Sequence, residues 1–358
     1  MKNLINKIKP TTRTTIVTLL FVIFFFGLSQ LLVNTGMAGY SYEGLLIPMC
    51  FYIILAVSLN LTVGILGELS LGHAGFMCIG GYVGAVFAML TENVITSDLL
   101  RYLLALVIGG VVAGLFGALI GFSILRLKGD YLAIVTLAFG QITYKILQQC
   151  HLIKDCNGLH FSFSEPIDAS KIDSASKVEI LNGAQTITGV EKYKSLIVSV
   201  IILLVTLIVI YNLIDSRAGR AFKAIRDNSI AAESIGINIS KYKLIVFFTS
   251  AFFAGVAGAM YAHTTSLEAS KFDFNLSIMF LVYVVLGGIG KIRGSIIATI
   301  ILYALPELLR DFATYRMIVY AIILIVMMIV TNNEKCKRII DSVTTKLKFW
   351  KKTAKEDN

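Results

Sequence analysis

The sequence predicts an all-α membrane protein, a polytopic bundle of about ten transmembrane helices, within a range of about eight to eleven. Hydrophobic residues make up 56% of the 358 positions and charged residues only 15%, which is more apolar material than a soluble core of this length buries. Apolar runs of the roughly 20 residues that a spanning helix needs follow one another through nearly the whole chain. Lys and Arg are also distributed unevenly around these runs, as in membrane proteins of defined orientation.

The expected transmembrane domain covers residues 16–331, between a basic tail at 1–15 and a second basic tail at 332–358. The first run follows several basic residues but no small-residue cleavage site follows it, so we assign it as a span and not as a signal peptide. The ten expected spans are 16–34, 44–66, 70–90, 102–125, 131–148, 195–213, 243–262, 276–289, 294–309 and 317–331.

The positive-inside rule orients these spans. With the N-terminus inside, ten spans return the C-terminus to the same side, and 22 of the 32 Lys and Arg residues then lie in the cytoplasm. The sequence therefore predicts a multi-pass protein of the inner (cytoplasmic) membrane with both termini cytoplasmic. The net charge of +10 reflects this topology and does not indicate nucleic-acid binding. The basic C-terminal tail, Lys346 to Lys355, is expected either to contact anionic membrane lipid or to be a solvated anchor.

A long polar excursion, residues 149–194, is expected on the external side. It includes the β-prone stretch Val178 to Ile187. Two interpretations remain open: the excursion caps the pore or touches a delivery protein, or it is a variable surface insertion. Cys150 and Cys156 both lie in it, either bonded to each other or as two separate thiols.

A cytoplasmic loop, residues 214–243, is predicted to form two short amphipathic helices. Asn228 or Ser229 is expected to cap the second helix, and Gly236 to end it. The loop either offers a compact knob to a cytoplasmic partner or lies on lipid as an interfacial helix. Apolar residues recur at helical spacing on one face of the first helix: Ala218, Ala221, Phe222 and Ile225.

No catalytic, cofactor or metal site is expected. The run GGIGKIRG at 287–294 lacks the glycine and the hydroxyl residue that a Walker phosphate loop requires, so any ATP must be hydrolysed by a partner. The four histidines have no metal-ligand spacing. No charged residue lies near the centre of an expected span, which argues against a proton- or sodium-coupled carrier.

Small residues mark two of the spans for close helix packing, because glycine lets helix backbones approach each other. These residues are Gly72, Gly75, Gly80, Gly81 and Gly84 in one span, and Gly109, Gly110, Gly114, Gly117 and Gly121 in the next.

Four ordered segments resemble the branched-chain amino-acid permease family of ABC importers. The first, GILGELSLGHAGFMCIGGYVGA at 64–85, matches the pattern LS-x-G-H-A-x-F-x-x-x-G-x-Y. The second, at 219–262, is similar to the family's cytoplasmic coupling segment and the span that follows it. The segments RLKGDYLAIVTLAFG at 126–140 and GGIGKIRGSIIA at 287–298 extend the resemblance over about residues 44–330. The external stretch CNGLHFSF, from Cys156, departs from the family's pattern.

The resemblance implies one subunit of a heteromeric importer without enzymatic activity of its own. Its implied partners are a second, homologous permease subunit, two ABC ATPase subunits and an extracytoplasmic substrate-binding protein. The coupling segment would dock into a groove on an ATPase subunit, and Ser70, His73, Phe76 and Tyr82 are candidates for the substrate pathway. The expected coupling residues are Arg220, Ala224, Arg226, Asp227, Ala232, Glu233 and Gly236.

The implied substrate is a branched-chain or other hydrophobic amino acid. Relatives of this permease type also carry urea, amides or other small polar solutes, and no motif in this sequence excludes them. A stand-alone secondary carrier is the third alternative.

Overall fold

The computed structural model describes residues 10–35, 40–92, 94–124, 130–155, 158–163, 178–183, 185–187 and 189–309, with 318–319, 321–322 and 325. The chain divides into two compact units, Met1–Thr299 and Ile300–Asn358, and the packing described below lies within the first.

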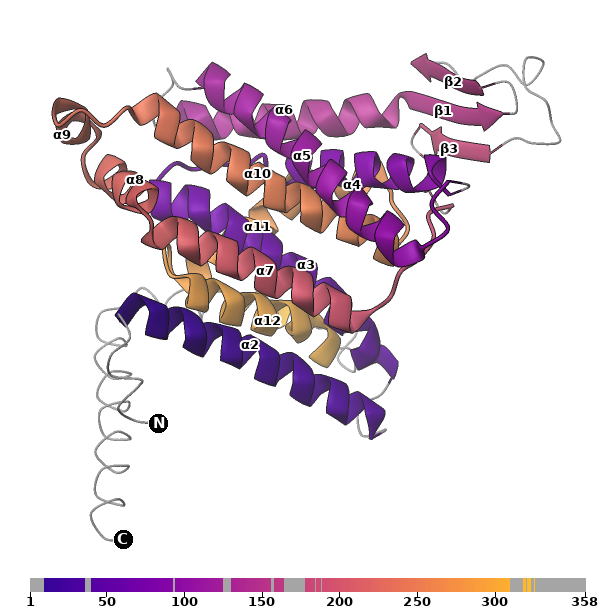
Figure 1. Cartoon of the computed structure of the whole chain (residues 1–358), viewed down its shortest axis with the longest axis horizontal. Helices are drawn as coiled ribbons and strands as arrows, with labels where there is room; N and C mark the ends of the chain where they lie inside the picture. Colours follow the sequence, from indigo (N-terminus) through magenta and orange to yellow (C-terminus); the bar gives the residue numbers. More distant parts are fainter. Residues whose placement is uncertain are drawn as a thin grey trace, which may run out of the picture. The chain divides into compact units, whose positions relative to one another are not determined.

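The described chain is predominantly helical, as predicted (Figure 1). Six helical segments are long and apolar enough to cross a membrane: Thr14–Asn34, Gly44–Leu66, His73–Leu90, Asp98–Ser123, Leu196–Asp215 and Ile239–Thr264. They belong to α2 (Pro10–Asn34), α3 (Tyr40–Asn60) with the π-helix η1 (Leu61–Leu66), α4 (His73–Leu90), α5 (Asp98–Ile124), α7 (Leu196–Asp215) and α10 (Ile239–Thr264).

Three further helices coincide with expected spans but do not reach this standard of length and apolarity: α6 (Asp130–Gln148), α11 (Phe274–Gly287) and α12 (Ile292–Leu308). The tenth expected span, 317–331, and the C-terminal tail lie almost entirely outside the described residues. Helix α2 begins at Pro10, inside the expected N-terminal tail. Helix α4 begins at His73 and not at residue 70, because residues 67–72 form a loop after η1.

Helices α4, α5 and α10 form the tightest packing in the first unit, and small residues explain it. A Cβ atom at Gly80 would overlap the backbone of Gly255 on α10, and one at Gly109 on α5 would meet the Gly80 carbonyl. A Cβ at Gly258 would overlap the carbonyl of Met77. The glycines predicted to mark close packing in α4 and α5 therefore do so, and α10 supplies the partner glycines.

The span made by α3 and η1 is the most buried of the six. The π turn was not predicted, since the apolar run from residue 44 to 66 gives no sign of it. Single π turns inside helices are rare and occur frequently at functional sites. Gly67 ends the turn with a positive φ of 82°. The main chain at 61–67 therefore departs from regular α-helix at the end of this buried span.

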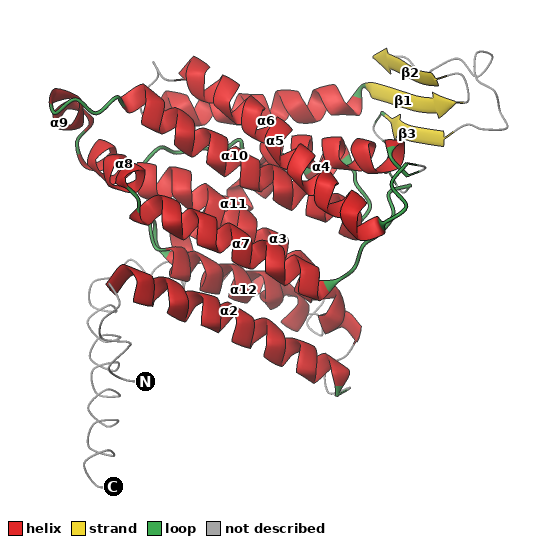
Figure 2. Ribbon diagram, in the orientation of Figure 1, coloured by secondary structure: helices red, strands yellow, loops and turns green. Residues whose placement is uncertain are grey.

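The excursion at 149–194 contains a small antiparallel sheet, drawn in yellow in Figure 2. Its strands are β1 (Cys150–Asp155), β2 (Gly158–Phe163) and β3 (Val178–Asn182), in the order β2-β1-β3. The predicted β-prone stretch thus supplies β3, and Ile187 makes an isolated bridge to Leu267. Cys150 is a free, buried thiol whose pKa is raised by burial, and Cys156 lies outside the described residues.

Candidate functional site

The loop at 214–243 folds into the two predicted helices, α8 (Arg217–Asp227) and α9 (Ser229–Ser234). The Ser216 hydroxyl accepts a hydrogen bond from the Gly219 amide at 3.3 Å and caps α8. The Asn228 side chain accepts from the Ala231 amide at 3.1 Å and caps α9. Gly236, with φ of 86°, follows the end of α9. Local capping signals in the sequence therefore set the boundaries of both helices.

Helix α8 is fixed to the membrane domain by its apolar face. Ala221, Phe222 and Ile225 are buried, and the Phe222 ring meets Tyr242 of α10 edge-on, with 6.0 Å between centroids. Ala218 is only half-buried. This face of α8 is therefore packed against protein, with Phe222 on α10.

The expected coupling residues divide into exposed and buried positions. Ala224 is half-buried, and Ala232 is buried, so Ala232 supports the packing of α9 and presents no surface of its own. The exposed members of the set are Arg220, Arg226, Asp227, Glu233 and Gly236.

Arg226 connects α8 to η1. Its Nη1 donates to the Gly64 carbonyl at 3.1 Å, while Nε and Nη2 donate to the neighbouring Asp227 carboxylate at 3.1 and 3.0 Å. Carbonyls at the end of a helix have no partner within that helix, so a cation is favourable there. The side chain also covers Gly67, where a Cβ would overlap it. The coupling segment thus reaches the irregular turn at the end of α3.

A second link joins the same regions. Lys243, near the start of α10, forms an ion pair with Glu68 in the loop that follows η1. Their side chains are only 13% and 16% exposed, so solvent screens the pair weakly. The loop at 67–72 is therefore held from the α8–α10 side at two points.

Asn60, the last residue of α3, extends the connection to the turn between α11 and α12. Its Oδ1 accepts from the Gly290 amide at 2.9 Å, and its Nδ2 donates to Ser295 Oγ at 2.9 Å. The residue is fully buried. We call Asn60, Gly64, Glu68, Arg226, Lys243, Gly290 and Ser295 the junction.

Sequence reasoning missed Asn60. A signal was available, because an amide inside an apolar run needs hydrogen-bond partners and often joins helices.

The pathway candidates lie in the interior of the unit. Nε2 of His73 is 2.8 Å from Ser58 Oγ, and the Ser58 carbonyl accepts from Ser250 of α10. Phe76 is buried with its ring 5.2 Å from that of Phe139. Tyr82 and Ser70 are buried too. The structure thus brings the rings of His73 and Phe76 to 6.4 Å between centroids and places Tyr82 between one and two turns beyond Phe76 on α4.

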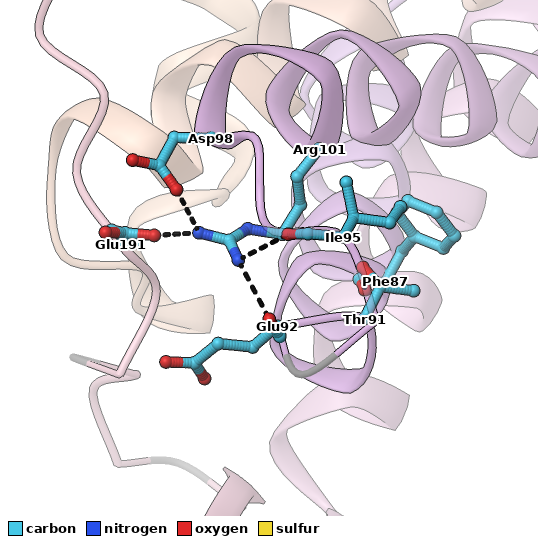
Figure 3. Close-up of polar contacts among 7 residues, drawn as sticks. All are labelled: Phe87, Thr91, Glu92, Ile95, Asp98, Arg101 and Glu191. Carbon is cyan, nitrogen blue, oxygen red and sulfur yellow. Dashed lines mark hydrogen bonds and ion pairs between the residues drawn. The ribbon is translucent and has the colours of Figure 1, made fainter.

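A second polar cluster lies at the other end of α4 and α5 (Figure 3). The guanidinium of Arg101 is nearly buried and donates to Asp98 at 2.9 Å, to Glu191, and to the carbonyls of Glu92 and Ile95. It links Glu191, in the segment that follows the β-sheet, to the start of α5. Sequence reasoning missed Arg101 because its partner Glu191 is 90 residues away.

Fold and site define a class: a multi-pass helical membrane protein whose amphipathic loop is joined to the interior. Residues 41–331 match the family described as the branched-chain amino acid transport system / permease component. The chain belongs to this family, as the sequence motifs predicted.

Among the relatives, the chain is 35% identical over 289 residues to the high-affinity branched-chain amino acid transport system permease protein LivM of Escherichia coli K12. It is 34% identical over 286 residues to LivM of Salmonella typhimurium LT2, and both alignments cover 78% of this chain and 66% of the relative. The chain thus spans slightly less than two thirds of these relatives. LivH of the same Salmonella strain is 25% identical over 264 residues, which is 70% of this chain and 79% of LivH. No solved structure matches the chain.

Proposed function

We propose that this protein is a permease subunit of an ATP-driven importer that carries branched-chain or other hydrophobic amino acids across the cytoplasmic membrane. The observation that carries the proposal is the junction, in which Arg226 of the coupling segment bonds directly to Gly64 at the end of a buried span. Family membership and the LivM relatives support the transport role and this class of substrate.

The proposed assembly contains a second, homologous permease, two ABC ATPase subunits and an extracytoplasmic binding protein. Similarity to both LivM and LivH supports a permease pair drawn from one family. ATP is hydrolysed by the ATPase subunits, since this sequence offers no phosphate loop.

The proposed orientation places α8, α9 and both termini in the cytoplasm. The positive-inside rule assigns the loops at 67–72, 216–238 and 288–291 to one side of the membrane. Each of these regions is tied to the end of α3 and η1 or to the start of α10: Arg226 bonds to Gly64, Gly290 bonds to Asn60, and Glu68 pairs with Lys243. The three regions therefore lie at the same end of the helices, which supports that assignment. The Arg101 cluster and the β-sheet then face outward, where a binding protein would deliver substrate.

In the proposed mechanism, ATP-driven movement of the ATPases displaces α8 and α9. Because Phe222 packs on Tyr242 and Arg226 binds Gly64, the displacement passes to α10 and to the end of α3. Ser58, two residues before Asn60 on α3, meets His73 of α4. Rearrangement at the end of α3 would therefore shift the pathway residues and open the pathway alternately to either side. His73, Phe76, Ser70 and Tyr82 remain the proposed pathway residues.

Cross-linking tests the proposed interface. The exposed α9 residue Glu233 is replaced by Cys, and the variant is purified with the co-encoded ATPases, each carrying a single Cys in its candidate groove. We expect an ATP-sensitive disulfide at Glu233→Cys and none at the control Lys192→Cys, which lies beyond the external sheet. Equal cross-linking at both positions, or none at Glu233→Cys, would contradict the interface.

A further inference from the structure

A cavity beside the junction carries charge that the transport mechanism does not use. Its volume is about 390 Å³, and its lining comes from one end of α2 and of α7, from α8, from Ile65 of η1 and from the segment 290–294. We call it the basic cavity. Small-molecule sites have volumes of about 300–1,000 Å³, so this cavity has room for a small organic ligand as well as for an ion. The side chains of Lys223 and Lys291 are exposed, which places the cavity within reach of solvent.

Four cationic side chains and one carboxylate line the basic cavity: Lys223, Arg226, Lys291, Arg293 and Asp215. Four positive charges and one negative charge leave the lining with a net charge of +3. Within the described part of the chain, the exposed ammonium groups of Lys223 and Lys291 form no ion pair. The positive-inside rule accounts for basic residues near the ends of the spans, but not for their convergence on one cavity from two distant parts of the chain. Because like charges repel one another, this convergence favours a bound anion.

The basic cavity also offers hydrogen-bond donors. Arg226 donates from Nη1 to Gly64 and from Nε and Nη2 to Asp227. A guanidinium has five N–H groups, so these three bonds leave two for a ligand. Arg293 is engaged by α2, because its Nε donates to Thr18 Oγ1 at 2.8 Å. The donors available to an anion are therefore those of Arg226 and of the two lysines.

The start of α12 adds to this arrangement. Its first three residues, Ile292, Arg293 and Gly294, all line the cavity. The Ser295 amide donates to the Lys291 carbonyl at 3.1 Å, whereas the three amides before it have no acceptor within the helix. The dipole of a helix also favours negative charge at this end. The helix start thus reinforces the attraction that the cationic side chains supply.

We propose that the basic cavity binds a phosphate group, held by Lys223 and Arg226 of α8 and by Lys291 before α12. A phosphate monoester carries about 1.5 to 2 negative charges at pH 7 and has three strong acceptor oxygens, which suits a lining of net charge +3 with donors from several directions. A carboxylate has one charge and two oxygens, so it matches this lining less well. The group can belong to a soluble phosphate or to a lipid headgroup.

The bound phosphate would join α8 to the segment 290–294, beside the bond between Arg226 and Gly64. It would therefore add a further link between the coupling segment and the junction. This inference goes beyond the proposed transport function and rests on it only for the cytoplasmic location of the cavity.

Amine labelling of the assembled transporter tests the proposal. The complex in phosphatidylcholine nanodiscs is treated with an acetylating reagent, and each lysine is followed by peptide mass spectrometry, so phosphate bound to the ATPase subunits does not enter the result. We expect inorganic phosphate to slow the labelling of Lys223 and Lys291 several-fold. Lys241, an exposed lysine near the start of α10, is the control and should be labelled at an unchanged rate. Chloride at the same ionic strength should protect none of the three, because it tests for simple screening.

A second arm identifies the source of the phosphate group. Nanodiscs with a minority of phosphatidic acid, in buffer without phosphate, present a phosphate monoester on a lipid. Protection by inorganic phosphate in phosphatidylcholine nanodiscs would assign a soluble ligand, and protection that appears only with phosphatidic acid would assign a lipid headgroup. If neither probe protects Lys223 and Lys291, the proposal is overturned.

The variant Lys291→Gln provides an independent check. The phosphate concentration that half-protects Lys223 should rise about tenfold, since one charge-assisted contact is lost. Lys241→Gln should leave this concentration as in wild type. An unchanged value in Lys291→Gln would equally overturn the proposal. Labelling needs no transport, so failure here would leave the proposed function standing, and failure of uptake would leave the labelling result standing.

Discussion

The guanidinium of Arg226 on α8 donates a hydrogen bond to the main-chain carbonyl of Gly64 in η1, across 162 positions of sequence and 3.1 Å of space. The contact joins an exposed residue of α8 to the most buried of the six candidate spans among the described residues. It is a contact between a side chain and the backbone, and the acceptor residue cannot be changed without disturbing its neighbours, because a Cβ at position 64 would overlap Asn60 Oδ1 and the Gly290 backbone. The contact is therefore tested at position 226.

Replacing Arg226 by Ala should uncouple ATP hydrolysis from transport. The change removes a bond that transmits movement, and coupling free energies of about 1–3 kcal/mol correspond to roughly 5- to 150-fold effects. We expect ATP hydrolysis by the reconstituted complex to continue while uptake per ATP falls by about tenfold or more. Arg217→Ala, at the start of the same helix, is the control and should leave the ratio unchanged. A wild-type ratio in Arg226→Ala would remove the contact from the mechanism.

The ion pair between Glu68 and Lys243 should behave as one unit. Reversing either charge alone places two like charges at a site where the two side chains are only 13% and 16% exposed, at a cost of about 3 kcal/mol or more. The double reversal restores an opposite pair and should recover much of that loss. Thermal unfolding of the four proteins in detergent gives the coupling energy directly. Additive losses in the double variant would show that the two residues do not interact.

Asn60→Leu should destabilise the protein by about 1–3 kcal/mol, because it leaves the half-buried amide of Gly290 and the buried hydroxyl of Ser295 without this partner. The side chain keeps a similar volume, so the effect reports the lost hydrogen bonds more than lost packing. Asn212→Leu is the matched control, since Asn212 lies exposed on α7. Equal melting temperatures for the two variants would contradict the role assigned to Asn60.

Arg101→Gln should loosen the segment at 189–193, which we call the strap. The change removes the charge that holds Asp98 and Glu191, and the amide of Gln is too short to replace all four bonds. We expect faster hydrogen exchange of the Tyr193 amide, which donates to the His263 carbonyl at 3.1 Å. Lys192→Gln, in the same strap, should exchange as wild type. Unchanged exchange in Arg101→Gln would mean that the strap is held by other contacts.

Gly258→Leu should prevent correct assembly of α4 and α10, because a Cβ at this position would overlap the Met77 carbonyl. Overpacking of this kind costs about 1–3 kcal/mol when a side chain yields, and here the obstacle is backbone. Gly44→Leu is the control, since a Cβ there has no neighbour within 4 Å. Size-exclusion profiles of the two variants make the comparison, and matching monodisperse peaks would contradict the close contact.

Local signals in the sequence predicted what depends on local physics. Apolar run length marked the spans, Asn228 and Gly236 marked the ends of α9, and repeated glycines marked the α4–α5 packing. Each of these signals is carried by residues within a few positions of one another, although the partners of the packing glycines lie on other helices.

Only part of the junction could be predicted from the sequence, because its contacts join residues that lie far apart in the chain. Arg226 stood out through its place in the coupling segment, yet its partner is a backbone carbonyl, which carries no mark in sequence. Asn60 and Gly290 are 230 residues apart, and the π turn at 61–66 leaves no pattern in an apolar run. The role of Arg101 could not be predicted either, because its partner Glu191 is distant in sequence and a charged residue at the start of a helix is common.

The most direct test of the transport assignment is uptake of radiolabelled leucine and of urea into proteoliposomes. The proteoliposomes contain this subunit with its co-encoded permease, ATPases and binding protein, and uptake is measured with and without ATP. We expect leucine uptake that requires ATP and all four components. ATP-dependent uptake of urea in place of leucine would keep the importer and contradict the proposed substrate, whereas uptake that needs no ATPase subunit would contradict the importer itself.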